Sequence, residues 1–202
     1  MTERQAMDGV GNWLLLMPQI SVASSKLRVM LGRRLQGIGA LQFQTNLWIL
    51  PYSAEHEKVI ANMLADLKEQ GGSGLVFRSQ VGSDEMHQSL IVHFQSIQHN
   101  EYATFICSCQ EFLTAVEQQV LNDNWNFDVL EEIERSLQKL NNRLARLQQR
   151  DFFPDDQSET ARTMHARCSQ ALYEFAISVY TYHDISVNAE EAKNTIEHGE
   201  GR

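Results

Sequence analysis

The sequence is poor in the residues that interrupt or cross-link a chain, with three prolines and three cysteines among 202 residues. An odd number of cysteines without a framework spacing is not typical of a disulfide-stapled secreted domain, so we expect reduced thiols in the core. No apolar run approaches the roughly 18 residues of a membrane span. The opening residues MTERQAMDGVGN lack the basic flank and the cleavage site of a signal peptide. These absences favour a cytosolic protein that does not cross a membrane.

Positive charge is missing from the middle of the chain. Residues 83–128 contain seven Asp and Glu but no Lys or Arg. The whole chain has a formal net charge of −9, which does not itself indicate a nucleic-acid-binding protein. Residues 1–82, in contrast, hold eight Lys and Arg against six Asp and Glu. The cations therefore concentrate in the first third of the chain and in one later segment, 135–150.

The motifs of common catalytic sites are also absent. The sequence has no G-x-S-x-G elbow, no G-x-G-x-x-G loop and no Walker loop. Cys107 and Cys109 lie two positions apart, which on a helix separates them by about 200°. His165 and Cys168 have a helical ligand spacing, but two ligands do not close a zinc site. We therefore expect no enzyme activity, no metal and no cofactor.

The first third of the chain alternates strand and helix patterns. Apolar runs, turn residues and helical periodicity predict a strand, a helix, a two-strand hairpin, a second helix and a fourth strand, at 12–20, 21–39, 40–51, 54–72 and 73–80. A Thr45-Asn46 turn closes the hairpin. The order β-α-β-β-α-β is the ferredoxin-like pattern, so we expect an α+β fold whose first module spans 12–82.

Only helical patterns follow Gly82, and they predict a helical region over 83–183. The expected helices are at 83–98, 99–123, 129–150 and 158–182. The third carries an apolar face within an arc of about 100°, formed by Leu130, Ile133, Leu137, Leu140, Leu144 and Leu147. With the last helix it is expected to form an antiparallel hairpin over about 129–182. Phe152 and Phe153 would cap its apolar seam, or else form an exposed patch for a partner. Residues 184–202 are polar and are expected to form a flexible tail.

Four cations of the first predicted helix are candidates for nucleic acid contact: Lys26, Arg28, Arg33 and Arg34. Phosphates require cations but no particular base pattern, so these side chains are suited to backbone contact. The first interpretation of these cations is nevertheless a solvated helix face whose arginine stems cover the sheet edge, and phosphate contact is the alternative.

A second set, here called the basic stripe, occupies an arc of about 80° on the helix 129–150. Its members are Arg135, Lys139, Arg143, Arg146 and Arg150, and they span about 22 Å at 1.5 Å per residue. The first interpretation is neutralisation by the acidic segment 83–128, or plain solvation. The alternative is an anionic partner, either DNA or a small oxyanion.

Six segments together resemble the N-terminal domain of the chromate-resistance protein ChrB family: WLLLMPQ, SSKLRVMLGRRLQGIGA, NLWILP, HNEYATFICSCQEFL, LQQRDFF and CSQALYEFAISVY. The resemblance runs from about residue 12 to residue 183. The strand–helix–hairpin pattern is also similar to the middle domain of PaaX repressors. The resemblance implies a ferredoxin-like fold and a cytosolic bacterial protein linked to chromate resistance, whose full-length relatives are described as chromate-responsive transcriptional regulators.

The residues and the resemblance together favour a non-catalytic regulatory or interaction protein in the control of chromate resistance. Its expected partners are DNA, through the cations of 21–39, and a second copy, through a sheet edge or the helical hairpin. Two alternatives stay open. One is an oxyanion sensor or enzyme that uses the basic stripe for chromate or sulfate, and the other is a scaffold that binds neither DNA nor an oxyanion.

Overall fold

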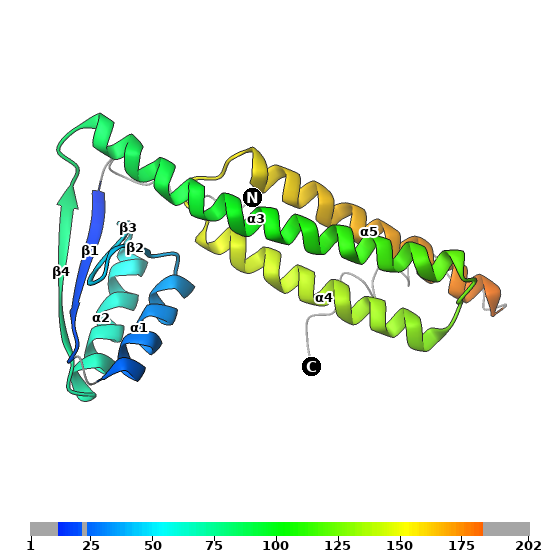
Figure 1. The fold of residues 1–202 in the computed structure, drawn as a ribbon, viewed down its shortest axis with the longest axis horizontal. Helices are drawn as coiled ribbons and strands as arrows, with labels where there is room; N and C mark the ends of the chain where they lie inside the picture. The colour runs from blue at the N-terminus through cyan, green and yellow to red at the C-terminus, as the bar shows by residue number, and fades with distance from the viewer. Residues whose placement is uncertain (1–11, 22–23, 184–202) are drawn as a thin grey trace. The chain divides into compact units, whose positions relative to one another are not determined.

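A computed structural model describes residues 12–21 and 24–183, and the predicted tail 184–202 lies outside the described residues. The elements are β1 (Asn12–Gln19), α1 (Ser25–Gly37), β2 (Leu41–Gln44), β3 (Leu47–Pro51), α2 (Ala54–Glu69), β4 (Ser73–Gln80), α3 (Asp84–Leu121), α4 (Phe127–Arg150) and α5 (Asp156–Tyr182) (Figure 1). The predicted α+β class is confirmed. Contacts divide the chain into two compact units. Of the described residues, one unit, the sheet unit, holds those up to Ser96 together with Gln149–Phe153, and the other, the helical unit, holds Ile97–Gln148 and 154–183.

The sheet unit is built on four antiparallel strands in the order β2-β3-β1-β4. This is the order that the ferredoxin-like pattern predicts. In Figure 1, α1 and α2 lie side by side on one side of the sheet. Their inward residues, among them Leu31, Leu35 and Ile60, pack with Leu14 and Leu50 into one core cluster. The short-range patterns of the first third therefore predict this half of the fold correctly.

The opposite face of the sheet carries a second, aromatic cluster. Trp13 alternates with Leu14 along β1 and so points to this face, where it stacks on Phe94 at a ring-centroid distance of 5.6 Å. Phe152 and Phe153 each pack edge-on against Phe94, at 6.2 and 5.8 Å. The prediction that these two phenylalanines cap the seam of the helical hairpin is therefore wrong. Both side chains pack on the apolar residues of this second face of the sheet. Helical periodicity does not reveal these contacts, because the strands lie far from residues 152 and 153 in the sequence.

α3 is one continuous helix of 38 residues, whereas the sequence suggested two helices that meet near residue 98. No proline or glycine interrupts residues 83–121, so nothing stops the helix. The apparent boundary reflects a change of partner. Leu90 and Phe94 pack in the aromatic cluster of the sheet unit, whereas Tyr102 and Phe105 pack in the core of the helical unit.

The helical unit consists of α5, α4 as far as Gln148 and the part of α3 from Ile97 onward. The predicted apolar face of α4 is confirmed, since its six residues are all buried: Leu130, Ile133, Leu137, Leu140, Leu144 and Leu147. Cys109 and Cys168 are buried in the same core, but Cys107 is exposed. The expectation of core thiols is therefore wrong for Cys107, which the helical turn carries to the outer side of α3. Across the described ranges, no helix has both the length and the apolar character that a bilayer span needs.

Candidate nucleic-acid interface

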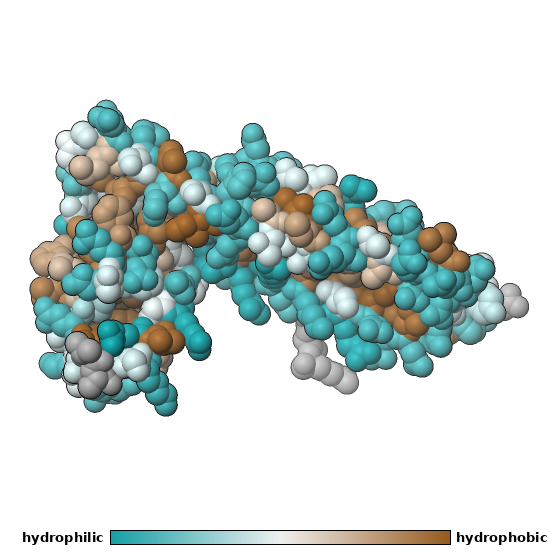
Figure 2. All heavy atoms as spheres, viewed as in Figure 1, coloured by the Kyte–Doolittle hydropathy of each residue, from teal (hydrophilic) through white to brown (hydrophobic). Residues whose placement is uncertain are grey.

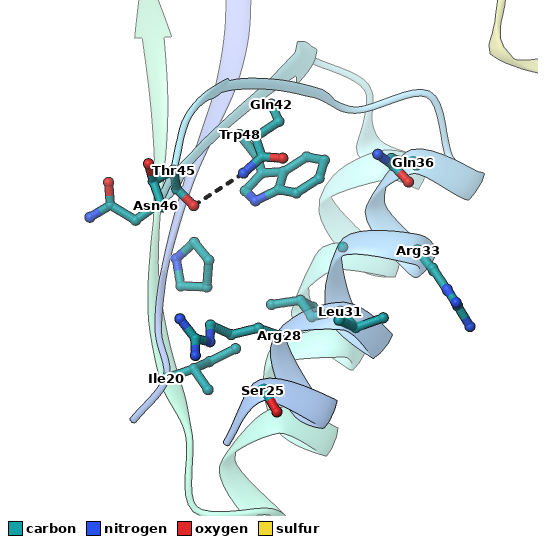
Figure 3. Close-up of a pocket in the computed structure, with 13 residues that line it drawn as sticks. Ile20, Ser25, Arg28, Leu31, Arg33, Gln36, Gln42, Thr45, Asn46 and Trp48 are labelled. Carbon is teal, nitrogen blue, oxygen red and sulfur yellow. Dashed lines mark hydrogen bonds between the residues drawn. The ribbon is translucent and has the colours of Figure 1, made fainter. Parts of the chain in front are cut away.

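A cleft of about 610 Å³ opens between α1 and the hairpin of β2 and β3, and we call it the α1 cleft (Figure 3). Trp48, only 5% exposed, and Leu31 form its apolar part. Amide, hydroxyl and guanidinium groups from α1 and from the hairpin line the rest, namely Ser25, Arg28, Arg33, Gln36, Gln42, Thr45 and Asn46. The cleft therefore combines an aromatic surface with donors suited to an anionic or polar partner.

The hairpin fixes one polar wall of this cleft through its own turn. Gln42 Nε2 donates a hydrogen bond of 3.2 Å to the carbonyl oxygen of Thr45, which holds the Gln42 amide against the turn (Figure 3). Sequence reasoning missed Gln36, Gln42 and Trp48 as site residues. These residues do not form a sequence motif, because they lie on three different elements and come together only when β3 brings Trp48 beneath α1.

Gly32 lies in the interior of α1, next to this cleft. A Cβ atom added there would lie 3.6 Å from the nearest atom of Trp48, which is ordinary van der Waals contact. Alanine restricts the unfolded chain more than glycine and favours a helix. We therefore expect Gly32→Ala to stabilise the protein by about 0.5–1 kcal/mol, measured as a higher urea midpoint. A lower midpoint would mean that Trp48 lies closer to α1 than the structure places it.

The four cations of α1 do not share one environment. Arg28 and Arg33 line the α1 cleft, and in Figure 3 Arg28 extends toward Ile20 whereas Arg33 points outward from the helix. Lys26 is exposed near the first turn. Arg34 lies elsewhere, because its Nη1 donates to Asp66 Oδ2 of α2 at 2.7 Å. Arg34 is thus paired within the sheet unit and does not line the α1 cleft.

The positive charge at the start of α1 does not stabilise the helix itself. The first turn contains no acidic residue, and the Ser24 side chain makes no capping hydrogen bond. Lys26 and Arg28 therefore add positive charge near the end of the helix that already carries the positive pole of its dipole, an unfavourable placement. An anion bound there would relieve it, since helix N-termini and cations both favour phosphate.

The basic stripe is divided among several surroundings. Arg135 lies 4.0 Å from Glu131 on its own helix, and both side chains are 66% exposed. Arg150 belongs to the sheet unit, where its Nη1 donates to the Gln36 carbonyl oxygen of α1 at 3.5 Å. That carbonyl lies in the last turn of α1 and also accepts a hydrogen bond of 3.0 Å from the Gly39 N–H.

Lys139 and Arg143 instead border a groove of about 480 Å³ between α3 and α4, here called the helical groove. Arg143 Nη1 donates to Ser108 Oγ of α3 at 3.0 Å. Glu111 and Glu132 line the same groove, so cations and carboxylates are mixed along it. A groove with balanced charge offers a small anion less attraction than the stripe suggested from sequence.

Cys109, Cys168 and His165 are titratable groups of the helical unit whose pKa values are shifted by their surroundings. Cys168 Sγ donates to the Cys109 carbonyl oxygen at 3.5 Å. A hydrogen bond between the two thiols, aided by Arg143, lowers the pKa of Cys109 against the effect of burial, and the same bond with burial raises the pKa of Cys168. Burial lowers the pKa of His165, whose Nε2 hydrogen bonds to Asn141. Within the described part of the chain, no three His, Cys, Asp or Glu residues are grouped so as to hold a metal ion.

Comparison with known families relates the chain to a family of proteins. A family model described as Protein ChrB, N-terminal, matches residues 28–185. The matched range includes Arg28 and Arg33 of the α1 cleft, the whole basic stripe and the aromatic pair Phe152-Phe153. No curated protein matches the chain.

Proposed function

The chain belongs to the ChrB N-terminal family, which relates it to chromate resistance, and from this premise we propose that it is a non-catalytic, nucleic-acid-binding regulator of that resistance. The role belongs to the cytoplasm, where bacterial DNA is found. The observation that carries the proposal is the arrangement on α1. This helix presents Lys26, Arg28 and Arg33 beside a polar cleft and has no carboxylate of its own.

The proposed contact is electrostatic. Lys26 and Arg33 are seven residues apart, so their side chains leave the same edge of α1 about 10 Å apart along its axis. Cations at that edge neutralise phosphates and release counterions, which makes affinity fall steeply with salt. α1 has one amide side chain, Gln36, and no Asn, so this surface is suited to positioning on the backbone and not to base readout.

Arg33→Glu tests this proposal. The change removes one phosphate contact and places a like charge beside the backbone, so binding to a short mixed-sequence duplex should weaken by about tenfold or more at low salt. The slope of log affinity against log salt should become shallower by about one unit. An electrophoretic retardation series over several salt concentrations measures both quantities.

Lys58→Glu is the matched control, because it makes the same change of net charge on an exposed residue of α2, away from the cleft. It should leave affinity within about twofold of wild type, since a remote exposed charge is largely screened. Equal losses from both variants would show that only overall charge matters. Wild-type protein without salt-sensitive binding would remove the hypothesis.

The second candidate is an oxyanion sensor, and the observation that favours it is the pair Lys139 and Arg143 on the helical groove. Chromate or sulfate bound between these cations would need no DNA. Isothermal titration with each anion separates the two functions. Heat of binding with chromate, together with no retardation of DNA, would place the oxyanion function first.

A further inference from the structure

The outer edge of β4 is an open pairing surface. β4 lies at the end of the sheet order and, within the described residues, pairs only with β1. That pairing runs over eight consecutive residue pairs, from Asn12–Gln80 to Gln19–Ser73, without a register shift. The strand is therefore regular along its whole length, and its outward N–H and C=O groups form an uninterrupted template.

The devices that usually protect an edge strand are missing from β4. It contains no proline, no lysine and no bulge. Its single charged residue, Arg78, is held on the helix-covered side of the sheet. There its Nε donates to Glu57 Oε1 at 2.7 Å, its Nη2 also bonds to Glu57, and its guanidinium lies 4.8 Å from the centre of the Tyr52 ring. Because Glu57 balances this charge, two such edges would approach without repulsion at their centre.

The other face of β4 carries exposed apolar side chains. Leu75 is 50% exposed and Phe77 47%, and their cross-strand neighbour Met17 is 37% exposed. These residues continue the face that Trp13 and the aromatic cluster occupy. Figure 2 shows apolar surface on the β4 side of the sheet unit. Exposed apolar residues beside an open edge mark an interaction site more strongly than either feature alone.

The sequence of β4 indicates what the partner is. Residues 73–79 read SGLVFRS and are nearly symmetric about Val76. If the strand pairs antiparallel with itself around Val76, Leu75 lies opposite Phe77, and Ser73 lies opposite Ser79. Gly74 lies opposite Arg78 and leaves space for it. Residues directly opposite each other in an antiparallel pair point to the same face, so both apolar pairs fall on the exposed face.

We propose that this edge is a homodimer interface in which β4 pairs with β4 of a second copy about a two-fold axis at Val76. The two four-stranded sheets then form one continuous sheet, and the Leu75 and Phe77 side chains of both copies form a single apolar strip across the axis. A two-fold interface must be self-complementary, and the symmetry of SGLVFRS meets that condition. The inference is independent of nucleic acid binding.

Phe77→Lys should break the dimer, because it places a charge opposite Leu75 of the second copy twice per interface. The side chain is half exposed, so the sheet unit itself should still fold. Sedimentation velocity over a concentration series should show a dimer for wild type and a dissociation constant raised by at least about tenfold for Phe77→Lys. Circular dichroism of each variant confirms that it is folded.

The register supplies a sharper test. In the double variant Leu75→Lys/Phe77→Glu, each lysine lies opposite a glutamate of the second copy, so dimerisation should recover relative to Phe77→Lys. Phe43→Lys is the matched control, since Phe43 is 50% exposed on the other edge strand, β2, and should leave the dimer intact. A monomeric wild type, a dimer insensitive to Phe77→Lys, or failure of the double variant to recover would each overturn the proposal. None of these outcomes depends on DNA, so the regulatory function is tested separately.

Discussion

Replacing Gly39 with alanine should destabilise the protein by about 2–4 kcal/mol, because two costs fall on one residue. Gly39 has φ of +82°, in the left-handed region that disfavours residues with a Cβ. A Cβ there would lie 2.8 Å from Cε2 of Phe152 and 3.2 Å from Cβ of Arg150. The alanine would therefore strain the turn after α1 and displace the aromatic residue that docks there. Urea denaturation followed by circular dichroism measures the loss.

Two comparisons separate these causes. Gly37→Ala should be nearly neutral, because a Cβ at Gly37 meets nothing within 4 Å and the residue has no positive φ. In a Phe152→Ala background the contact with the ring is gone, so Gly39→Ala should cost less there, leaving mainly the backbone term. An equal cost in both backgrounds would show that Phe152 does not pack on Gly39.

Local sequence patterns were sufficient to predict most helices and strands of this chain. β4 occupies the predicted residues 73–80, and α4 buries the predicted face, because alternation and helical periodicity record which side of an element is covered. The same patterns failed where the partner of an element changes. In α3 the inward face shifts between Phe94 and Tyr102 as the helix passes from one core to the other, and this shift resembled a break between helices.

The placement of Phe152 and Phe153 failed for a related reason. A turn between two amphipathic helices suggests that its apolar residues close the seam between them. In the structure they pack on Phe94 and around Trp13, on a sheet face that no short-range pattern links to residue 152. Only the three-dimensional contact shows that this turn belongs to the sheet unit.

The residues of the candidate site, like the helices and strands, could be predicted from the sequence only in part. The sequence indicated the α1 cations as a group of candidates, because four cations without an acid on one helix are visible in a single window. It did not identify the contact of Arg34 with Asp66, which lies 32 residues away and removes that arginine from the set. Nor did it identify Trp48 and Gln42, which enter the site from the hairpin. Charge is therefore readable from sequence, whereas its neutralisation depends on the fold.

The largest effect in the helical unit is expected for Phe105→Ala. Phe105 is fully buried at the point where α3 meets the other helices, and its ring stacks on His165 of α5 with centroids 6.4 Å apart. Removing a buried phenylalanine side chain typically costs about 3–5 kcal/mol, through lost transfer free energy and the cavity left behind. Phe105→Leu fills most of that space and should cost clearly less.

Amide hydrogen exchange gives this prediction a local readout. Protection should fall in peptides from α4 and α5, which share the core with Phe105, and much less in β1 and β3, whose residues belong to the other compact unit. Ile97→Ala is the control on the same helix, because Ile97 is 42% exposed and its truncation should change stability by less than about 1 kcal/mol. If Phe105→Ala cost no more than Ile97→Ala, the core that joins α3 to α5 would not be built around this ring. If protection fell equally in the sheet, the two units would unfold as one.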